Sequence, residues 1–136
     1  MARELQLDVD QQLPTVEGVE VQLQQLVLNL VMNAMESMQS TRRRLLRIRA
    51  NLSKPGVVQV SIEDTGIGID PSNLDRIFKP LFTTKVRGMG MGLAICQSIV
   101  QTHDGRIWVT PGANGGASFQ FELPCRSRLQ VEAETR

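Results

Sequence analysis

The stretch from Asp64 to Leu93 decides the fold and reads DTGIGIDPSNLDRIFKPLFTTKVRGMGMGL. It begins with a carboxylate and two close glycines, and it ends in alternating glycines that open a helical pattern. Glycine lets a backbone approach a ligand closely, and free N–H groups at the start of a helix suit a phosphate. The stretch therefore predicts a nucleotide site, with a base pocket near Asp64 and a phosphate pocket from Gly88 to Gly92.

Composition bounds the class of protein. The chain has 136 residues, of which 41% are apolar and 21% charged, as expected for one soluble globular domain. Its net charge of +1 favours neither a nucleic acid nor a membrane as partner. Cys96 and Cys125 form neither a metal motif nor a disulfide framework, and no secretion signal or membrane span is evident. We expect one cytoplasmic domain over residues 1–125 and a frayed tail over 126–136.

Strand and helix patterns alternate along the chain. Alternation of polar and apolar residues predicts strands, and apolar recurrence every three or four residues predicts helices. The expected strands cover residues 4–9, 45–52, 57–63, 106–110 and 117–123. The expected helices cover about 19–39, 70–76 and 92–103, the second with Asp70 as N-cap and Pro71 at its first position. The strands at 45–52 and 57–63 flank Pro55-Gly56 and should form a hairpin.

Asp64 ends the third expected strand in phase with its apolar face. Val60, Ile62 and Asp64 point the same way because side chains alternate along a strand. A carboxylate on an apolar face requires donors. Backbone amides, the Thr65 hydroxyl and a ligand donor such as an adenine amino group remain open as partners.

The first long helix carries a polar stripe that its core face does not explain. That core face is expected from Leu23, Leu26, Leu30 and Ala34, which recur every three or four residues. Gln25, Asn29, Asn33 and Glu36 share one face, and the residues between them are apolar. A solvated face accounts for Gln25. Asparagine, however, competes with the helical backbone for hydrogen bonds, and Glu or Lys would solvate a face better. We interpret the two asparagines as ligand-binding residues.

Residues 78–87 form a polar linker with aromatic anchors, which indicates a lid over phosphates. Lys85 or Arg87 would reach the phosphates, although the aromatics could instead simply pack under a loop. The glycines that follow match neither a Walker A loop nor a dinucleotide fingerprint.

The order of these pieces resembles the superfamily of gyrase, heat-shock chaperone, histidine-kinase and mismatch-repair ATPases. NLVMNA at 29–34 resembles the N box, and DTGIG at 64–68 the first glycine box. FKPLF at 78–82 resembles the F box of histidine kinases, and GMGMGL at 88–93 their second glycine box. GGASF at 115–119 matches the glycine-rich segment before the last strand.

This resemblance implies a two-layer α/β sandwich of the Bergerat type. A mixed, mostly antiparallel sheet of about five strands would lie under three main helices, with an ATP lid. Asn33 would hold Mg²⁺, with Asn29 beside it toward the phosphates, and Asp64 would accept from the adenine amino group. The positions assigned to ATP are Asn29, Asn33, Asp64, Gly66, Gly68, Ile69, Lys85, Gly88, Gly90, Gly92, Leu93 and Ser118.

The resemblance also implies a reaction. Asn29 stands where gyrase-type hydrolases carry a general-base Glu, and an amide cannot take a proton from water. Transfer from Mg-ATP to a protein histidine is therefore expected, catalysed by Asn29, Asn33 and Lys85 through positioning and charge neutralisation. The acceptor would lie on separate dimerisation helices, with a response regulator downstream, because His103 resembles a structural histidine. The alternatives are an anti-sigma-factor-type serine kinase, an ATP-binding module without transfer activity, and a hydrolase.

Overall fold

The computed structural model describes residues 3–79, 92–113 and 115–125. Five strands and two α-helices follow the predicted order, and their boundaries differ from the expected ones by a few residues at most. The elements are β1 (Arg3–Val9), α1 (Glu20–Ser37), β2 (Arg44–Lys54), β3 (Val57–Glu63), the 3₁₀ helix η1 (Pro71–Asn73), α2 (Gly92–Thr102), β4 (Arg106–Pro111) and β5 (Ala117–Pro124).

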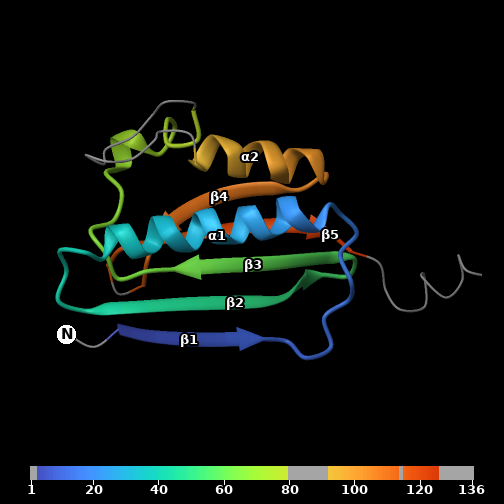
Figure 1. The fold of residues 1–136 in the computed structure, drawn as a ribbon, viewed down its shortest axis with the longest axis horizontal. Coiled ribbons are helices and arrows are strands. Elements are labelled where there is room, and N and C mark those ends of the chain that lie inside the picture. Colours follow the sequence, from blue (N-terminus) through green and yellow to red (C-terminus); the bar gives the residue numbers. More distant parts are fainter. Residues whose placement is uncertain (1–2, 80–91, 114, 126–136) are drawn as a thin grey trace, which may run out of the picture.

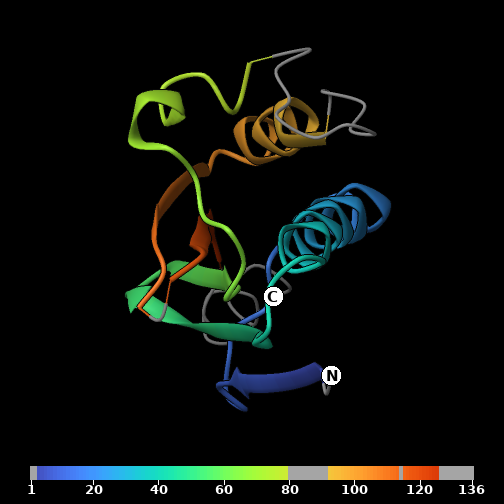
Figure 2. The same ribbon diagram turned by 90° about the vertical axis from the view of Figure 1, so that its left-hand side faces the viewer.

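The strands form one open, mixed sheet in the order β1-β2-β3-β5-β4. Only the β1–β2 pair is parallel, and β2 and β3 form the predicted antiparallel hairpin. Both α-helices lie on the same face of the sheet, side by side (Figures 1 and 2). The architecture is the α/β sandwich that the sequence predicts.

The core lies between this helical layer and the sheet. The predicted apolar face of α1 supplies Leu26, Leu30 and Ala34, all essentially inaccessible to solvent. The facing residues from α2, β3 and β5 are Cys96, Ile99, Val100, Ile62, Phe119, Phe121 and Leu123. The phase of β3 is as predicted, because Asp64 is buried on the same side as Ile62.

The helix expected over residues 70–76 is only one 3₁₀ turn followed by further turns. Asp70 caps it as expected, since its Oδ1 accepts from the backbone N–H and the hydroxyl of Ser72, both at 2.9 Å. The following N–H groups bond mostly three residues back, as in Leu74 to Pro71 and Arg76 to Asn73. Serine, asparagine and aspartate favour such local bonds over a regular helix, which accounts for the shorter element.

The predicted lid over residues 78–87 and the predicted tail over 126–136 lie almost wholly outside the described residues, as does Lys85. Within the described ranges, no helix combines the length and apolar content that a bilayer crossing requires.

Candidate functional site

Asp64 is the buried charge at the end of β3, with 1% of its surface exposed. Its Oδ1 accepts from the N–H of Gly66 at 2.8 Å and from the N–H of Ala117 at 3.3 Å. Its own N–H donates to the carbonyl of Ala117 at 3.0 Å, which extends the β3–β5 pairing by one residue. Backbone amides are therefore among the partners that the sequence left open for this carboxylate.

Burial raises the pKa of Asp64 above its ordinary value of 3.8. The hydrogen bonds from Gly66 and Ala117 act in the opposite direction, as does a weaker one from the Ser37 hydroxyl. The negative charge of Glu63 adds to the upward shift. The carboxyl is thus largely dehydrated, and an additional donor from a ligand would bond to it in a medium of low dielectric constant.

Two glycines allow the backbone to close around Asp64. A Cβ on Gly66 would lie 2.2 Å from Ser37 Oγ, so only glycine lets this loop touch the end of α1. Gly116 has a φ of +71°, and a Cβ there would lie 2.3 Å from the Asp64 carbonyl oxygen. The sequence predicted Gly66 as a base-pocket residue, but it did not single out Gly116 as a packing partner of Asp64.

Thr65 fastens the same loop to the start of β2. Its Oγ1 accepts from the Leu45 N–H at 3.1 Å and donates to the Arg43 carbonyl at 2.8 Å. It also lies 3.6 Å from the sulfur of Met38, just beyond α1. The sequence offered this hydroxyl as a possible partner of Asp64, but its hydrogen bonds hold the loop to the residues at the start of β2.

The polar stripe of α1 leads to the Asp64 loop. Asn29, Asn33 and Ser37 are spaced by four residues and so lie one above another on the helix, about 6 Å apart along its axis. The last of them, Ser37, accepts from the Ile67 N–H through its carbonyl at 3.2 Å. Asn33 consequently stands one helical turn from the loop that contains Asp64.

Asn29 lies against the second helix. Burial raises the pKa of the Cys96 thiol to about 11, and a hydrogen bond from the Asn29 side chain acts in the opposite direction. Asn29 and Asn33 are both half-buried, whereas Gln25 and Glu36 on the same stripe are exposed. The two asparagines thus lie on the side of α1 that faces α2. Only Gln25 and Glu36, at the two ends of the stripe, form a solvent-exposed face.

The other residues predicted to bind ATP do not all lie near Asp64. Gly92 begins α2, and Ile69 and Leu93 pack partly against the core. Ser118 is buried, but its Oγ accepts from Gln120 Nε2 at 3.3 Å on the face of β5 opposite Phe119. The structure therefore does not bring Ser118 together with Asp64. Lys85, Gly88 and Gly90 lie outside the described residues.

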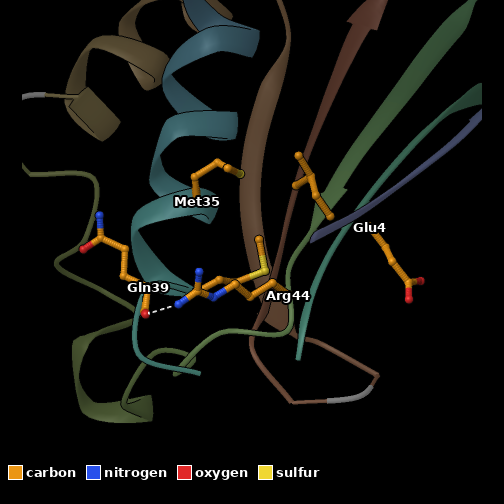
Figure 3. Close-up of a pocket in the computed structure, with 6 residues that line it drawn as sticks. Glu4, Met35, Gln39 and Arg44 are labelled. Atoms are coloured by element: carbon orange, nitrogen blue, oxygen red, sulfur yellow. Dashed lines mark hydrogen bonds between the residues drawn. The ribbon is translucent and has the colours of Figure 1, made fainter. Parts of the chain in front are cut away.

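Two hollows lie elsewhere on the described surface. One of about 20 Å³, room for about one water, lies where α1 ends over β1 and β2, and Arg44 donates there to the carbonyl of Gln39 (Figure 3). Another of about 510 Å³ lies beside His103 at the far end of α1. Neither is lined by Asn29, Asn33 or Asp64.

Comparison with known proteins agrees with this arrangement. Residues 18–127 match the family of histidine kinase-, DNA gyrase B-, and HSP90-like ATPases, so the chain belongs to that family. Its homologues are sensor histidine kinases. It is 38% identical over 121 residues to the sensor protein FixL of Bradyrhizobium diazoefficiens and 37% identical over 125 residues to the sensor histidine kinase ZraS of Escherichia coli.

These relatives are longer proteins. The chain spans 24% of the FixL length and 26% of the ZraS length, while 89% and 90% of the chain is covered. Among solved structures, the mycobacterial sensor histidine kinase MprB matches with a TM-score of 0.81 and 27% identity, over 91% of this chain and 84% of that one. The catalytic domain of the histidine kinase ThkA matches with a TM-score of 0.75 and 31% identity, over 90% and 78%. The fold and family are those of a histidine kinase catalytic domain.

Proposed function

We propose that this chain binds Mg-ATP beside α1 and the Asp64 loop and transfers the γ-phosphoryl to a histidine on separate acceptor helices. The observation that carries the proposal is the row Asn29, Asn33 and Ser37, which ends on the loop that buries Asp64. Two amide side chains that would bind a metal thus lie along α1, and the buried carboxylate that would accept from a base lies in the loop at the end of that helix. The structure of ShkA in complex with AMPPNP matches this chain with a TM-score of 0.77, which supports an adenine nucleotide as the proposed ligand.

Asp64 would select the base. The two backbone amides engage Oδ1, and a carboxylate has acceptor capacity on both oxygens. It would accept from the adenine amino group, with Gly66, Gly68 and Ile69 beside the ring. Lys85 and the glycines at positions 88, 90 and 92 would contact the phosphates, as the family resemblance implies.

The donor set fits a magnesium ion that keeps most of its other ligands from water and phosphate. Asn33 offers an amide oxygen, the hard kind of ligand that Mg²⁺ prefers, and it is half-buried beside Asn29. Within the described ranges, no group of three or more His, Cys, Asp or Glu residues is placed to hold a metal. The ion, when bound, would neutralise charge on the phosphates.

Two residues favour transfer over hydrolysis and over self-modification. Asn29 cannot act as a general base toward water, and its side chain bonds to Cys96. The single histidine, His103, has both ring nitrogens engaged, Nδ1 with the Ile99 carbonyl at 2.8 Å and Nε2 with the Val19 N–H at 3.0 Å. The phosphoacceptor is therefore proposed to be a histidine of another domain, and a response regulator would take the phosphoryl group afterwards.

The test is incubation with Mg²⁺ and γ-labelled ATP, with and without a panel of acceptor-helix domains from sensor kinases. We expect acid-labile, base-stable label on an acceptor domain, none on the isolated chain, and slow release of phosphate. Label on His103 would refute the assignment of a separate acceptor. Rapid hydrolysis without an acceptor would favour a hydrolase, and binding without any transfer would favour an ATP-binding module.

A further inference from the structure

His103 connects the two α-helices at the end remote from the Asp64 loop. Val19 is the N-cap residue of α1, and it makes no side-chain cap of its own. His103 Nε2 instead accepts the Val19 N–H from across the helix pair. The imidazole lies directly against Gly18, where a Cβ would be 2.4 Å from the ring Cδ2. The end of α2 therefore caps the beginning of α1.

The partners determine the tautomer of this ring. The Ile99 carbonyl can only accept, so Nδ1 carries the proton, and the Val19 N–H can only donate, so Nε2 carries the lone pair. The ring must be neutral and Nδ1-protonated to make both bonds. We refer to His103, Gly18 and Val19 together as the remote clamp.

A second anchor holds the opposite end of α1. Ile67 donates to the Ser37 carbonyl, and Gly66 packs against the Ser37 side chain. From Val19 to Ser37 the helix is about 27 Å long, with Asn29 about 12 Å and Asn33 about 6 Å from the Ser37 end. If the remote clamp opened while the Ser37 anchor held, Asn29 would move about twice as far as Asn33.

We propose that His103 is a positioning residue, which keeps Asn29 in register with Cys96 of α2 by clamping the far end of α1. The functional part of this inference rests on the proposed nucleotide site. The mechanical part concerns the two helices alone. Because the displacement grows with distance from Ser37, the clamp would act on Asn29, toward the phosphates, more than on the metal ligand Asn33.

Two amide variants separate the two hydrogen bonds. His103→Gln places an amide oxygen where Nε2 lies and can still accept from Val19, whereas His103→Asn reaches only the position of Nδ1 and leaves Val19 without its acceptor. Alkylation of Cys96 by a thiol reagent, located by mass spectrometry, reports how closely α1 and α2 pack, because Cys96 is fully buried between them. Cys125 lines the hollow beside the remote clamp and can itself respond to the substitutions, so a free small-molecule thiol in the same reaction serves as the reference.

We expect Cys96 to be alkylated about two- to tenfold faster in the Asn variant than in wild type. This factor corresponds to the loss of one net hydrogen bond, which makes opening of the helix pair more frequent. The Gln variant should stay close to wild type. Transfer to the acceptor domain should fall more than the affinity for Mg-AMPPNP in the Asn variant only. Equal behaviour of the two variants in the alkylation arm, whether both like wild type or both faster, would overturn the clamp.

Nuclear magnetic resonance of the wild type tests the clamp without any substitution. His103 is the only histidine, so its ring nitrogens are assigned without ambiguity. We expect the Nδ1-protonated neutral tautomer, and the Nε2-protonated tautomer would refute the geometry. If wild type fails to bind Mg-AMPPNP, the proposed function is wrong, and the tautomer and the Cys96 alkylation still decide whether the clamp exists.

Discussion

Replacement of Asp64 by asparagine should separate its structural role from its role in base recognition. Asp64→Ala is the blunter change, because it removes the acceptor of two N–H groups, those of Gly66 and Ala117. Each unpaired buried donor costs about 1–3 kcal/mol, a large share of the roughly 5–15 kcal/mol that stabilises a domain. Asp64→Asn keeps an oxygen for both amides and replaces the other oxygen by an NH₂ group.

In the asparagine variant, a donor would face the adenine amino group, which is also a donor. The loss of one hydrogen bond and the desolvation of the unpaired groups should weaken ATP binding by about 1–3 kcal/mol, or roughly ten- to a hundredfold. Guanine carries a carbonyl oxygen at that position, so binding of GTP should improve relative to ATP. Calorimetric titration of both proteins with Mg²⁺ and non-hydrolysable analogues of each nucleotide is the assay. Unchanged selectivity in a folded variant would refute the role of Asp64 in base recognition.

The same pair of proteins has a pH signature. Because burial raises the pKa of Asp64 above 3.8, the folded state binds more protons than the unfolded state between 3.8 and the raised value. The free energy of unfolding of wild type should therefore fall as pH rises through this window and then level off. The amide of the Asp64→Asn variant does not titrate. In urea denaturation, the free energy of unfolding of the variant should therefore increase relative to that of wild type as pH rises through this window. If the difference in unfolding free energy between the two proteins did not change with pH, burial would not be the dominant influence on the pKa of Asp64.

Three further substitutions test the proposed metal ligand and the packing around Asp64. Asn33→Ala should weaken Mg²⁺-dependent nucleotide binding sharply in a folded protein, while Gln25→Ala, an exposed member of the same stripe, should not. Equal affinities in calorimetric titration would contradict this. Gly116→Ala should destabilise the fold by more than Gly115→Ala, since both have positive φ but only Gly116 has backbone within 2.3 Å of the added Cβ. The strain alone costs about 1–2 kcal/mol, and similar urea midpoints would refute the packing argument. Thr65→Val should cost about 1–3 kcal/mol by leaving the Leu45 N–H and the Arg43 carbonyl unpaired, whereas Thr65→Ser should recover most of it in the same denaturation assay.

The sequence alone determined the order of the strands and α-helices and which side chains of β3 and α1 point into the core. Alternation in β3 and the recurrence of Leu26, Leu30 and Ala34 in α1 are local consequences of strand and helix periodicity, so they were predictable without a structure. The burial of Asp64 followed from the same strand periodicity, whereas a role of Asn29 in ligand binding stays a prediction. The 3₁₀ turn after Asp70 was not predictable, because local side-chain bonds compete there with a helix of marginal propensity.

Only the tertiary structure decided which distant groups meet. Pairing of β3 with β5 brings Gly116 and Ala117 to Asp64, and the antiparallel approach of α1 and α2 brings His103 to Val19 across 84 positions of sequence. Such contacts depend on strand register and helix packing. These are determined jointly by core residues from all the elements, so the sequence of a single segment does not predict them.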